Sequence, residues 1–187
     1  MTYKKKICLE KSMITSTSNQ QMKNLMLLMK KAKARNEQEL FVVEGRKMFQ
    51  EVPEEWLKQV YVSESFLAEN EAVIAGCTYE VVSDPVFKAV SDTQTPQGIL
   101  CLVKKSQYRL EELLKGEDTH LLILESIQDP GNLGTMLRTG EGAGITGVVM
   151  NHTTVDLFNP KTIRSTMGSI YRMPFFVTRD LAETICE

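Results

Sequence analysis

The chain of 187 residues contains few of the residues that build metal centres or disulfide frameworks. Its four cysteines have no paired spacing, which predicts neither a zinc site nor disulfides: Cys8, Cys77, Cys101 and Cys186. The two histidines, His120 and His152, are isolated and offer no catalytic triad or metal cluster. We therefore expect no bound metal and reduced, partly buried thiols.

Long apolar segments are also missing. No apolar run approaches the length of about 20 residues that spans a membrane. Residues 1–10 include a basic cluster but no apolar core long enough for a secretory signal. These absences argue against a membrane partner and predict a soluble, cytoplasmic protein.

A glycine-rich nucleotide loop is missing as well. Residues 142–147 have the glycine spacing of a dinucleotide fingerprint, but they would follow a helix and lead into a strand, the reverse of what that fingerprint requires. We interpret them as a helix end and a tight turn. No phosphate-binding loop with a lysine is present either.

The net charge of −2 is unevenly distributed. Residues 1–47 hold 11 Lys or Arg against 4 Glu, a balance of +7, whereas the remainder carries 11 basic and 20 acidic residues, a balance of −9. The basic part could follow the phosphates of a nucleic acid. It could also be a tail and a solvated helix face, and charge alone does not establish RNA binding.

Apolar periodicity predicts an α/β protein in two parts. After a basic tail, 1–17, we expect a compact alternating domain at 18–105, with strands at 40–43, 60–62, 79–82 and 98–103 and helices at 21–33, 66–75 and 86–90. The methionines of the first helix should lie in the core. A polar linker, 106–119, with a short helix at 110–114, then leads to a second domain at 120–187.

The second domain starts with an apolar block, 120–127, suited to a strand buried on both faces. A helix with apolar residues at helical spacing and a strand at 147–150 follow, which predicts a right-handed parallel unit. Ligands collect outside the carboxyl ends of parallel strands, where Asn132 must lie. Arg138, almost two helical turns later, could reach back so that both side chains face one phosphate or ribose. Asn132 could instead serve only the geometry of a turn.

Two ordered segments of this domain resemble the SpoU/TrmH family of RNA ribose 2'-O-methyltransferases, in the SPOUT superfamily. Residues 129–143, with the spacing Asn132-x-Gly134-x-x-x-Arg138, resemble the first family motif, and residues 158–169, closed by 173–175, resemble the segment that follows it. In the amino half, residues 18–23, 41–46 and 95–99 resemble the family's small substrate-binding domain, whose topology is similar to ribosomal protein L30e.

The resemblance implies an S-adenosylmethionine-dependent enzyme that acts as a homodimer of knotted domains, with ribosomal RNA favoured as substrate and transfer RNA open. The family assigns deprotonation of the ribose hydroxyl to the arginine at position 138. Because a guanidinium has a pKa above about 12, we expect Arg138 instead to lower the pKa of the hydroxyl and to hold the adjacent phosphate.

Two later family motifs build the cofactor pocket and tie a trefoil knot, and the sequence stops at Glu187 before either. We therefore expect the cofactor-binding residues beyond Glu187, and an incomplete second sheet with an open edge and apolar surface. The alternative is a non-catalytic RNA-binding protein derived from this family.

Asn159-Pro160 resembles a helix cap followed by a proline at the first helical position. That cap would place three candidates for RNA contact on the early turns of a helix: Lys161, Arg164 and Ser165. Ser169 and Arg172 follow as further candidates. In the amino domain we expect RNA backbone contacts from four residues: Lys23, Arg35, Arg46 and Lys47.

Overall fold

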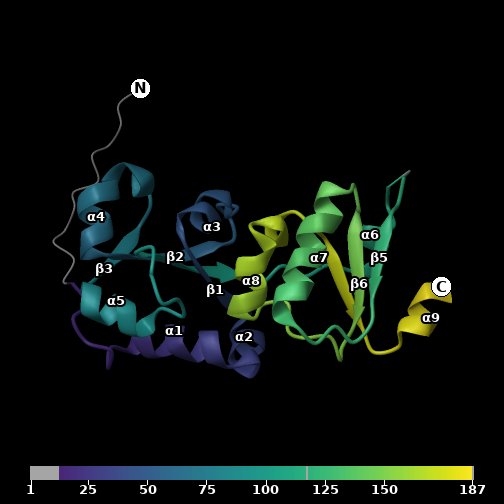
Figure 1. Ribbon diagram of the computed structural model, residues 1–187, viewed down its shortest axis with the longest axis horizontal. Coiled ribbons are helices and arrows are strands. Elements are labelled where there is room, and N and C mark those ends of the chain that lie inside the picture. Colours follow the sequence, from purple (N-terminus) through teal and green to yellow (C-terminus); the bar gives the residue numbers. More distant parts are fainter. Residues whose placement is uncertain (1–12, 117, 187) are drawn as a thin grey trace.

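The structure is a computed structural model that describes residues 13–116 and 118–186. The described residues form two β-sheets that follow one another along the longest axis of the molecule (Figure 1). Residues 1–12, which hold most of the predicted basic tail and Cys8, lie outside the described part of the chain.

The first sheet has four strands in the order β1-β4-β2-β3. β4 (Ile99–Lys104) is antiparallel to both β1 (Leu40–Glu44) and β2 (Leu57–Ser63), and β2 is parallel to β3 (Tyr79–Val82). Side chains alternate between the two faces of a strand, so Phe41 and Val43 join one core cluster while Val42 joins another. Both faces of this sheet are therefore packed.

Helices cover both faces of the first sheet (Figure 1). On one face lie α1 (Gln20–Lys30), α2 (Ala32–Gln38) and α5 (Asp84–Val90). On the other lie α3 (Arg46–Glu51), α4 (Glu64–Asn70) and the short 3-10 helix η1 (Glu71–Ile74).

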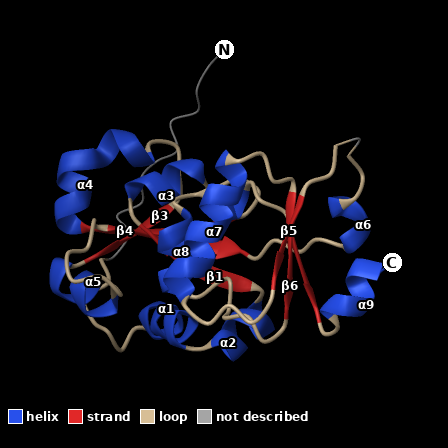
Figure 2. Cartoon of the chain, turned by 45° about the vertical axis from the view of Figure 1, so that its right-hand side comes forward, coloured by secondary structure: helices blue, strands red, loops and turns tan. Residues whose placement is uncertain are grey.

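The second sheet consists of β5 (Leu121–Leu124), β6 (Gly147–Asn151) and β7 (Phe175–Thr178), all parallel and in that order. The strand-helix-strand prediction is thus confirmed, with α7 (Pro130–Gly142) as the crossover helix. α7 and α8 (Pro160–Thr166) lie on one side of the sheet, and the short helices α6 (Leu110–Leu113) and α9 (Leu181–Cys186) lie on the other (Figure 2). The 3-10 helix η2 (Ser169–Tyr171) packs against α7 and α8.

Caps set the ends of these helices. Asn159 caps α8 by accepting a hydrogen bond from the backbone N–H of Lys161 at 2.9 Å, and Pro160 occupies the first position, as predicted. At the end of α7, the N–H of Ile145 donates to the carbonyl of Gly140 and that of Gly144 to Glu141, a Schellman ending with Gly144 at φ +80°. The prediction that residues 142–147 end a helix and turn is confirmed.

Two expectations were wrong in detail. The helix predicted at 21–33 is broken at Lys31, whose extended backbone (φ −123°, ψ 112°) separates α1 from α2; its Met22 is nevertheless buried in the core, as expected. The strand predicted at 120–127 is short and not buried on both faces, because it has β6 as its neighbour among the described strands and Ile123 is 39% exposed. An open edge with apolar surface is therefore present at β5.

One hydrophobic cluster runs without interruption from the first sheet into the second. The rings of Phe41 and Phe158 meet across the junction at a centroid distance of 4.9 Å, and those of Trp56 and Tyr171 at 6.3 Å. Among the described helices, none is long and apolar enough to cross a membrane.

Candidate functional site

The loop between β5 and α7 is held in place by the loop that follows β6. The backbone N–H of Ser126 donates to Asn151 Oδ1 at 2.8 Å, and the Gln128 amide donates to the carbonyl of Thr153 at 3.0 Å. Ser126 itself has a left-handed φ of 52°, which ends β5 and turns the chain toward α7. The start of α7 is thereby fixed at the carboxyl edge of the sheet.

Asp129 caps the start of α7. Its carboxylate accepts a hydrogen bond of 2.8 Å from the backbone N–H of Asn132 and lies 3.3 Å from the Lys161 ammonium. The N–H bond, and secondarily Lys161, lower the pKa of Asp129 below its ordinary value. Asp129 thus remains charged and anchors one of the residues predicted to contact RNA.

A close contact between α7 and α8 brings the two family segments together. A Cβ at Gly134 would lie 2.5 Å from both the Ser165 Cβ and the Thr162 carbonyl oxygen, so only glycine allows this approach. The same packing places Lys161 and Ser165 beside Gly131 at the start of α7. Ser165 Oγ also donates to the Lys161 carbonyl at 2.9 Å.

Asn132 and Arg138 are both exposed on α7. In the described part of the chain, neither side chain has a hydrogen-bonding or ionic partner. Six residues separate them, which on an ideal helix corresponds to roughly 9 Å along the axis and about 120° around it. Their joint contact with one ribose or phosphate stays a prediction.

Three segments that sequence analysis treated separately converge at the junction between the sheets. A cavity of about 200 Å³ is lined by residues of 44–48, 93–97 and 164–167. Gln97 Oε1 accepts from the backbone N–H of Arg46 at 3.0 Å, and Arg164 pairs with Asp92 at 2.8 Å. Lys47 also lines this cavity, and its ammonium is 3.9 Å from Glu51. Lys23 is exposed on α1, away from these lining residues.

Arg35 does not have the role that the sequence predicted. Its side chain is only 3% exposed and pairs with Asp156 at 2.5 Å. The guanidinium also donates to the carbonyls of Leu28 at 2.5 Å and Met29 at 3.2 Å. Because these partners occupy it inside the protein, Arg35 cannot reach a phosphate and instead ties the two domains together.

Arg172 is likewise occupied. It bridges Glu51 of α3, at 2.6 Å, and Glu141 of α7, and these carboxylates raise its pKa. Hydrogen bonding from Arg172 lowers the pKa of Glu141. Arg172 is therefore a second tie between the domains, which acts on the carboxyl-terminal turns of α7.

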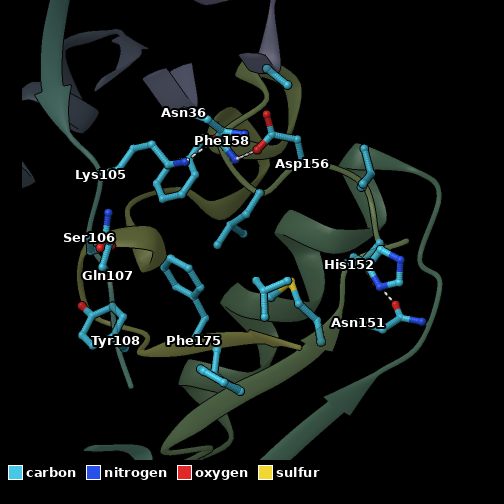
Figure 3. A pocket seen from close by; sticks show the side chains of 17 residues that line it. Asn36, Lys105, Ser106, Gln107, Tyr108, Asn151, His152, Asp156, Phe158 and Phe175 are labelled. Atoms are coloured by element: carbon cyan, nitrogen blue, oxygen red, sulfur yellow. Dashed lines mark hydrogen bonds between the residues drawn. The ribbon is translucent and has the colours of Figure 1, made fainter. Parts of the chain in front are cut away.

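A further cavity, of about 590 Å³, escaped sequence analysis (Figure 3). It lies at the carboxyl end of β6 and along β7, and segment 105–108 and α2 close its other side. Polar residues at the end of a buried parallel strand, here Asn151 as the last residue of β6 and His152 after it, were the available signal.

Among the described residues, no group of three or more potential ligands could hold a metal ion. The described cysteines are free: Cys77 is half-buried, Cys101 is buried and Cys186 is exposed.

Comparison with known proteins defines the class of protein. Residues 19–101 match the MRM3-like substrate binding domain, and residues 119–187 match the SpoU rRNA Methylase family. The chain belongs to the SpoU rRNA methylase family, which confirms the resemblance and the α/β fold class.

The chain is 35% identical to the 23S rRNA (guanosine(2553)-2'-O)-methyltransferase RlmP of Bacillus subtilis, over 93% of this chain and 68% of that protein. It is 30% identical to human mitochondrial rRNA methyltransferase 3, over 83% of this chain and 39% of that protein. The chain thus spans about two thirds of the bacterial relative and well under half of the human one.

Solved structures agree with the fold. The AdoMet-bound rRNA methyltransferase of Sinorhizobium meliloti superposes with a TM-score of 0.78 at 25% identity, over 94% of this chain and 68% of that one. The SpoU methyltransferase AviRb of Streptomyces viridochromogenes gives a TM-score of 0.76 at 18% identity, over 90% of this chain and 65% of that one, and shows the fold alone.

Neither Asn132 nor Arg138 lines either of the two cavities described above. The position of the cofactor-binding residues stays a prediction.

Proposed function

We propose that this chain belongs to an S-adenosylmethionine-dependent RNA methyltransferase that methylates a ribose 2'-hydroxyl in ribosomal RNA. The observation that carries the proposal is the exposed Asn132 and Arg138 on α7, in a domain of the SpoU rRNA methylase family. The name of the B. subtilis relative, over 93% of this chain, supports this reaction and substrate.

Arg138 acts on the ribose and its phosphate in this proposal. A neutral hydroxyl is a poor nucleophile and must lose its proton as its oxygen bonds to carbon. A guanidinium is a very weak base, but its planar fork can bind a phosphate through two hydrogen bonds, and its charge favours the ionised oxygen. Arg138 has no partner in the described chain that would compete for these bonds.

Asn132 supplies both a donor and an acceptor for the same nucleotide. Lys161 and Ser165, which α8 places beside the start of α7, extend the contact surface for the RNA backbone. Arg46, Lys47 and Arg164 extend this contact surface across the domain junction, and Lys23 adds to it from α1. Arg35 is buried against Asp156 and is not part of this surface.

The finer features of the family complete the proposal. The functional unit is a cytoplasmic homodimer of knotted domains that needs no metal. Ribosomal RNA is preferred over transfer RNA because the relatives named above are rRNA methyltransferases.

Substitution of Arg138 in the natural full-length protein tests the proposal, with methyl transfer from labelled S-adenosylmethionine to ribosomal RNA as the readout. R138A should lower the rate about 100-fold or more, the scale observed when a charge-stabilising donor is removed. R138K should be nearly as slow, because an ammonium cannot form the bidentate contact. R179K changes another exposed arginine and should leave the rate unchanged.

High residual activity in R138K would disprove the bidentate role of Arg138. Absence of transfer by the wild type to ribosomal RNA, combined with tight RNA binding, would instead favour the non-catalytic RNA-binding protein.

A further inference from the structure

The cavity of about 590 Å³ at the carboxyl end of β6 and along β7 has no role in the function proposed above. We propose that it binds one nucleobase of the RNA, unstacked from its strand, at a distance from the methylated ribose. The inference rests on the proposed function for the identity of the polymer. Its volume lies within the range of roughly 300–1,000 Å³ that is typical of small-molecule sites.

Aromatic side chains form one wall of this cavity. Tyr108 and Phe175 meet edge to face at a centroid distance of 5.4 Å, and Phe175 meets Phe158 at 5.7 Å. These contacts fix the rings before any ligand arrives. Val177, 47% exposed, adds accessible apolar surface to the lining. Flat apolar surfaces of this kind take nucleobases irrespective of sequence, because every base has a π-face.

Polar groups stand across from the aromatic wall. Figure 3 shows Asn151 and His152 on the opposite side from Tyr108, with Asn36 at the top of the view and Gln107 beside Tyr108. The His152 imidazole offers a donor and an acceptor, and the Asn36 amide, whose oxygen accepts from Lys105, retains its N–H donors; these groups match the edges of a base. The combination of a ring-lined wall and a mixed polar rim is the chemistry of a base site rather than of an aliphatic ligand.

The charge of the cavity suits a polyanion. Lys105, half-buried, lies with its ammonium 4.6 Å above the Phe158 ring and 2.6 Å from Asn36 Oδ1. Burial lowers its pKa, whereas Asp156 opposes that shift. Asp156, the acidic residue of the lining, is already paired with Arg35 at 2.5 Å, so it does not repel a phosphate.

The cavity is also connected to α7. Asn151 lines it, and the same side chain accepts from the Ser126 N–H at 2.8 Å and donates to Ser126 Oγ at 3.1 Å. Thr154, another lining residue, donates to Asn151 Oδ1 at 2.9 Å. A base in the cavity therefore rests on the network that holds the loop before Asp129, and it would fix the register of the strand relative to Arg138.

Nuclear magnetic resonance on the 187-residue chain tests the site without reading methyl transfer. Adenosine, guanosine, cytidine and uridine monophosphates are titrated in turn, followed by short single-stranded oligoribonucleotides. We expect the shifted backbone amides to cluster at Gln107, His152 and Val177. We also expect oligoribonucleotides to bind at least tenfold more tightly than the mononucleotides, because neighbouring phosphates add contacts.

Two variants act on the cavity by independent means. K105M removes its cation and should weaken binding by roughly three- to tenfold, whereas K104M removes the adjacent exposed lysine, which does not line the cavity, and should have little effect. A32Y places a ring in the mouth at an exposed position of α2 and should weaken binding by blocking entry. Thermal melts check that each variant is folded.

Amide shifts that fall elsewhere, or an equal loss in K104M and K105M with no effect of A32Y, would overturn the base site. Equal affinity for mononucleotides and oligoribonucleotides would overturn RNA as the source of the base and identify a free nucleotide. Either failure leaves the methyltransferase proposal intact, since R138A is scored by methyl transfer. Absence of methyl transfer by the wild-type protein, with binding at the cavity retained, would reject only the proposed function.

Discussion

The junction between the two sheets and the outer edge at β5 are opposite in character. At the junction, apolar rings interlock and charged side chains are paired: Arg35 with Asp156, Arg164 with Asp92, and Arg172 with two carboxylates. At β5, Leu121 and Leu122 are only half-buried and Ile123 is exposed. The second domain is therefore anchored on one side and open on the other.

This contrast indicates how α7 is held. α8 lies between α7 and the first sheet (Figure 1) and packs closely against α7. The packed junction therefore holds α8, and α8 in turn holds α7, the helix that carries Arg138. We therefore expect substitutions to change the free energy of unfolding less, the farther they lie from the buried part of the junction. The predictions below test that gradient.

Removal of the Asp156 carboxylate should have the largest effect. D156A leaves the buried guanidinium of Arg35 without its counter-ion, and such uncompensated charges cost about 3–5 kcal/mol. K33A breaks a pair between exposed residues, with a Lys33–Glu37 distance of 3.7 Å, and should change the free energy of unfolding by about 1 kcal/mol or less. Urea unfolding measures both, and similar values would contradict a special role for the junction.

Addition of a methyl group at the close contact between α7 and α8 should have the next largest effect on stability. In G134A the new methyl group would meet a backbone oxygen and a Cβ at 2.5 Å, and overpacking of this kind costs about 1–3 kcal/mol. G142A is the matched control in the same helix, because a Cβ there has no neighbour within 4 Å. We expect it to be neutral or stabilising by up to about 1 kcal/mol. Calorimetric melting of G134A and G142A tests whether the close contact with α8 holds α7 in position.

The sequence predicted those features that depend on local chemistry. Asn159-Pro160 specifies a helix start by its own hydrogen bond and fixed φ, and the apolar alternation of β1 and β4 specifies strands. Gly134 and Arg138 fall in a family segment that can be recognised in a single sequence from the order and spacing of its residues.

Other features depend on partners far along the chain. The break at Lys31 accompanies the turn of Arg35 toward Asp156, which lies 121 residues away. Arg164 and Gln97 belong to different domains, so no local pattern shows that they line one cavity. The sequence of β5 is as apolar as that of a buried strand, yet β5 is partly exposed, because exposure is determined by the neighbouring elements and not by composition.

Adjacent residues of the sheet offer a direct test of the open edge. Ile123 is paired in register with Val149, yet the first is 39% exposed and the second 1%. V149T buries a hydroxyl and should destabilise the fold by about 1–2 kcal/mol. I123T should change stability by about 0.5 kcal/mol or less and should reduce self-association of the chain, because it removes apolar surface at a strand edge. Unfolding and sedimentation measure these effects, and an equal loss of stability would show that β5 is buried in solution.

Substitution of Arg172 should also have a small effect, since its side chain is 47% exposed. R172M should cost about 1 kcal/mol or less at neutral pH. In the folded protein the pKa of Glu141 lies below its ordinary value of 4.5. The contribution of Glu141 to stability is therefore complete above the unfolded pKa and is lost as the pH falls through the folded pKa. The stability difference between wild type and R172M should therefore shrink on acidification from neutral pH to about pH 3. K33M, which also removes one positive charge, controls for net charge. A difference that stays constant or grows in acid would mean that the Arg172–Glu141 contact does not stabilise the junction.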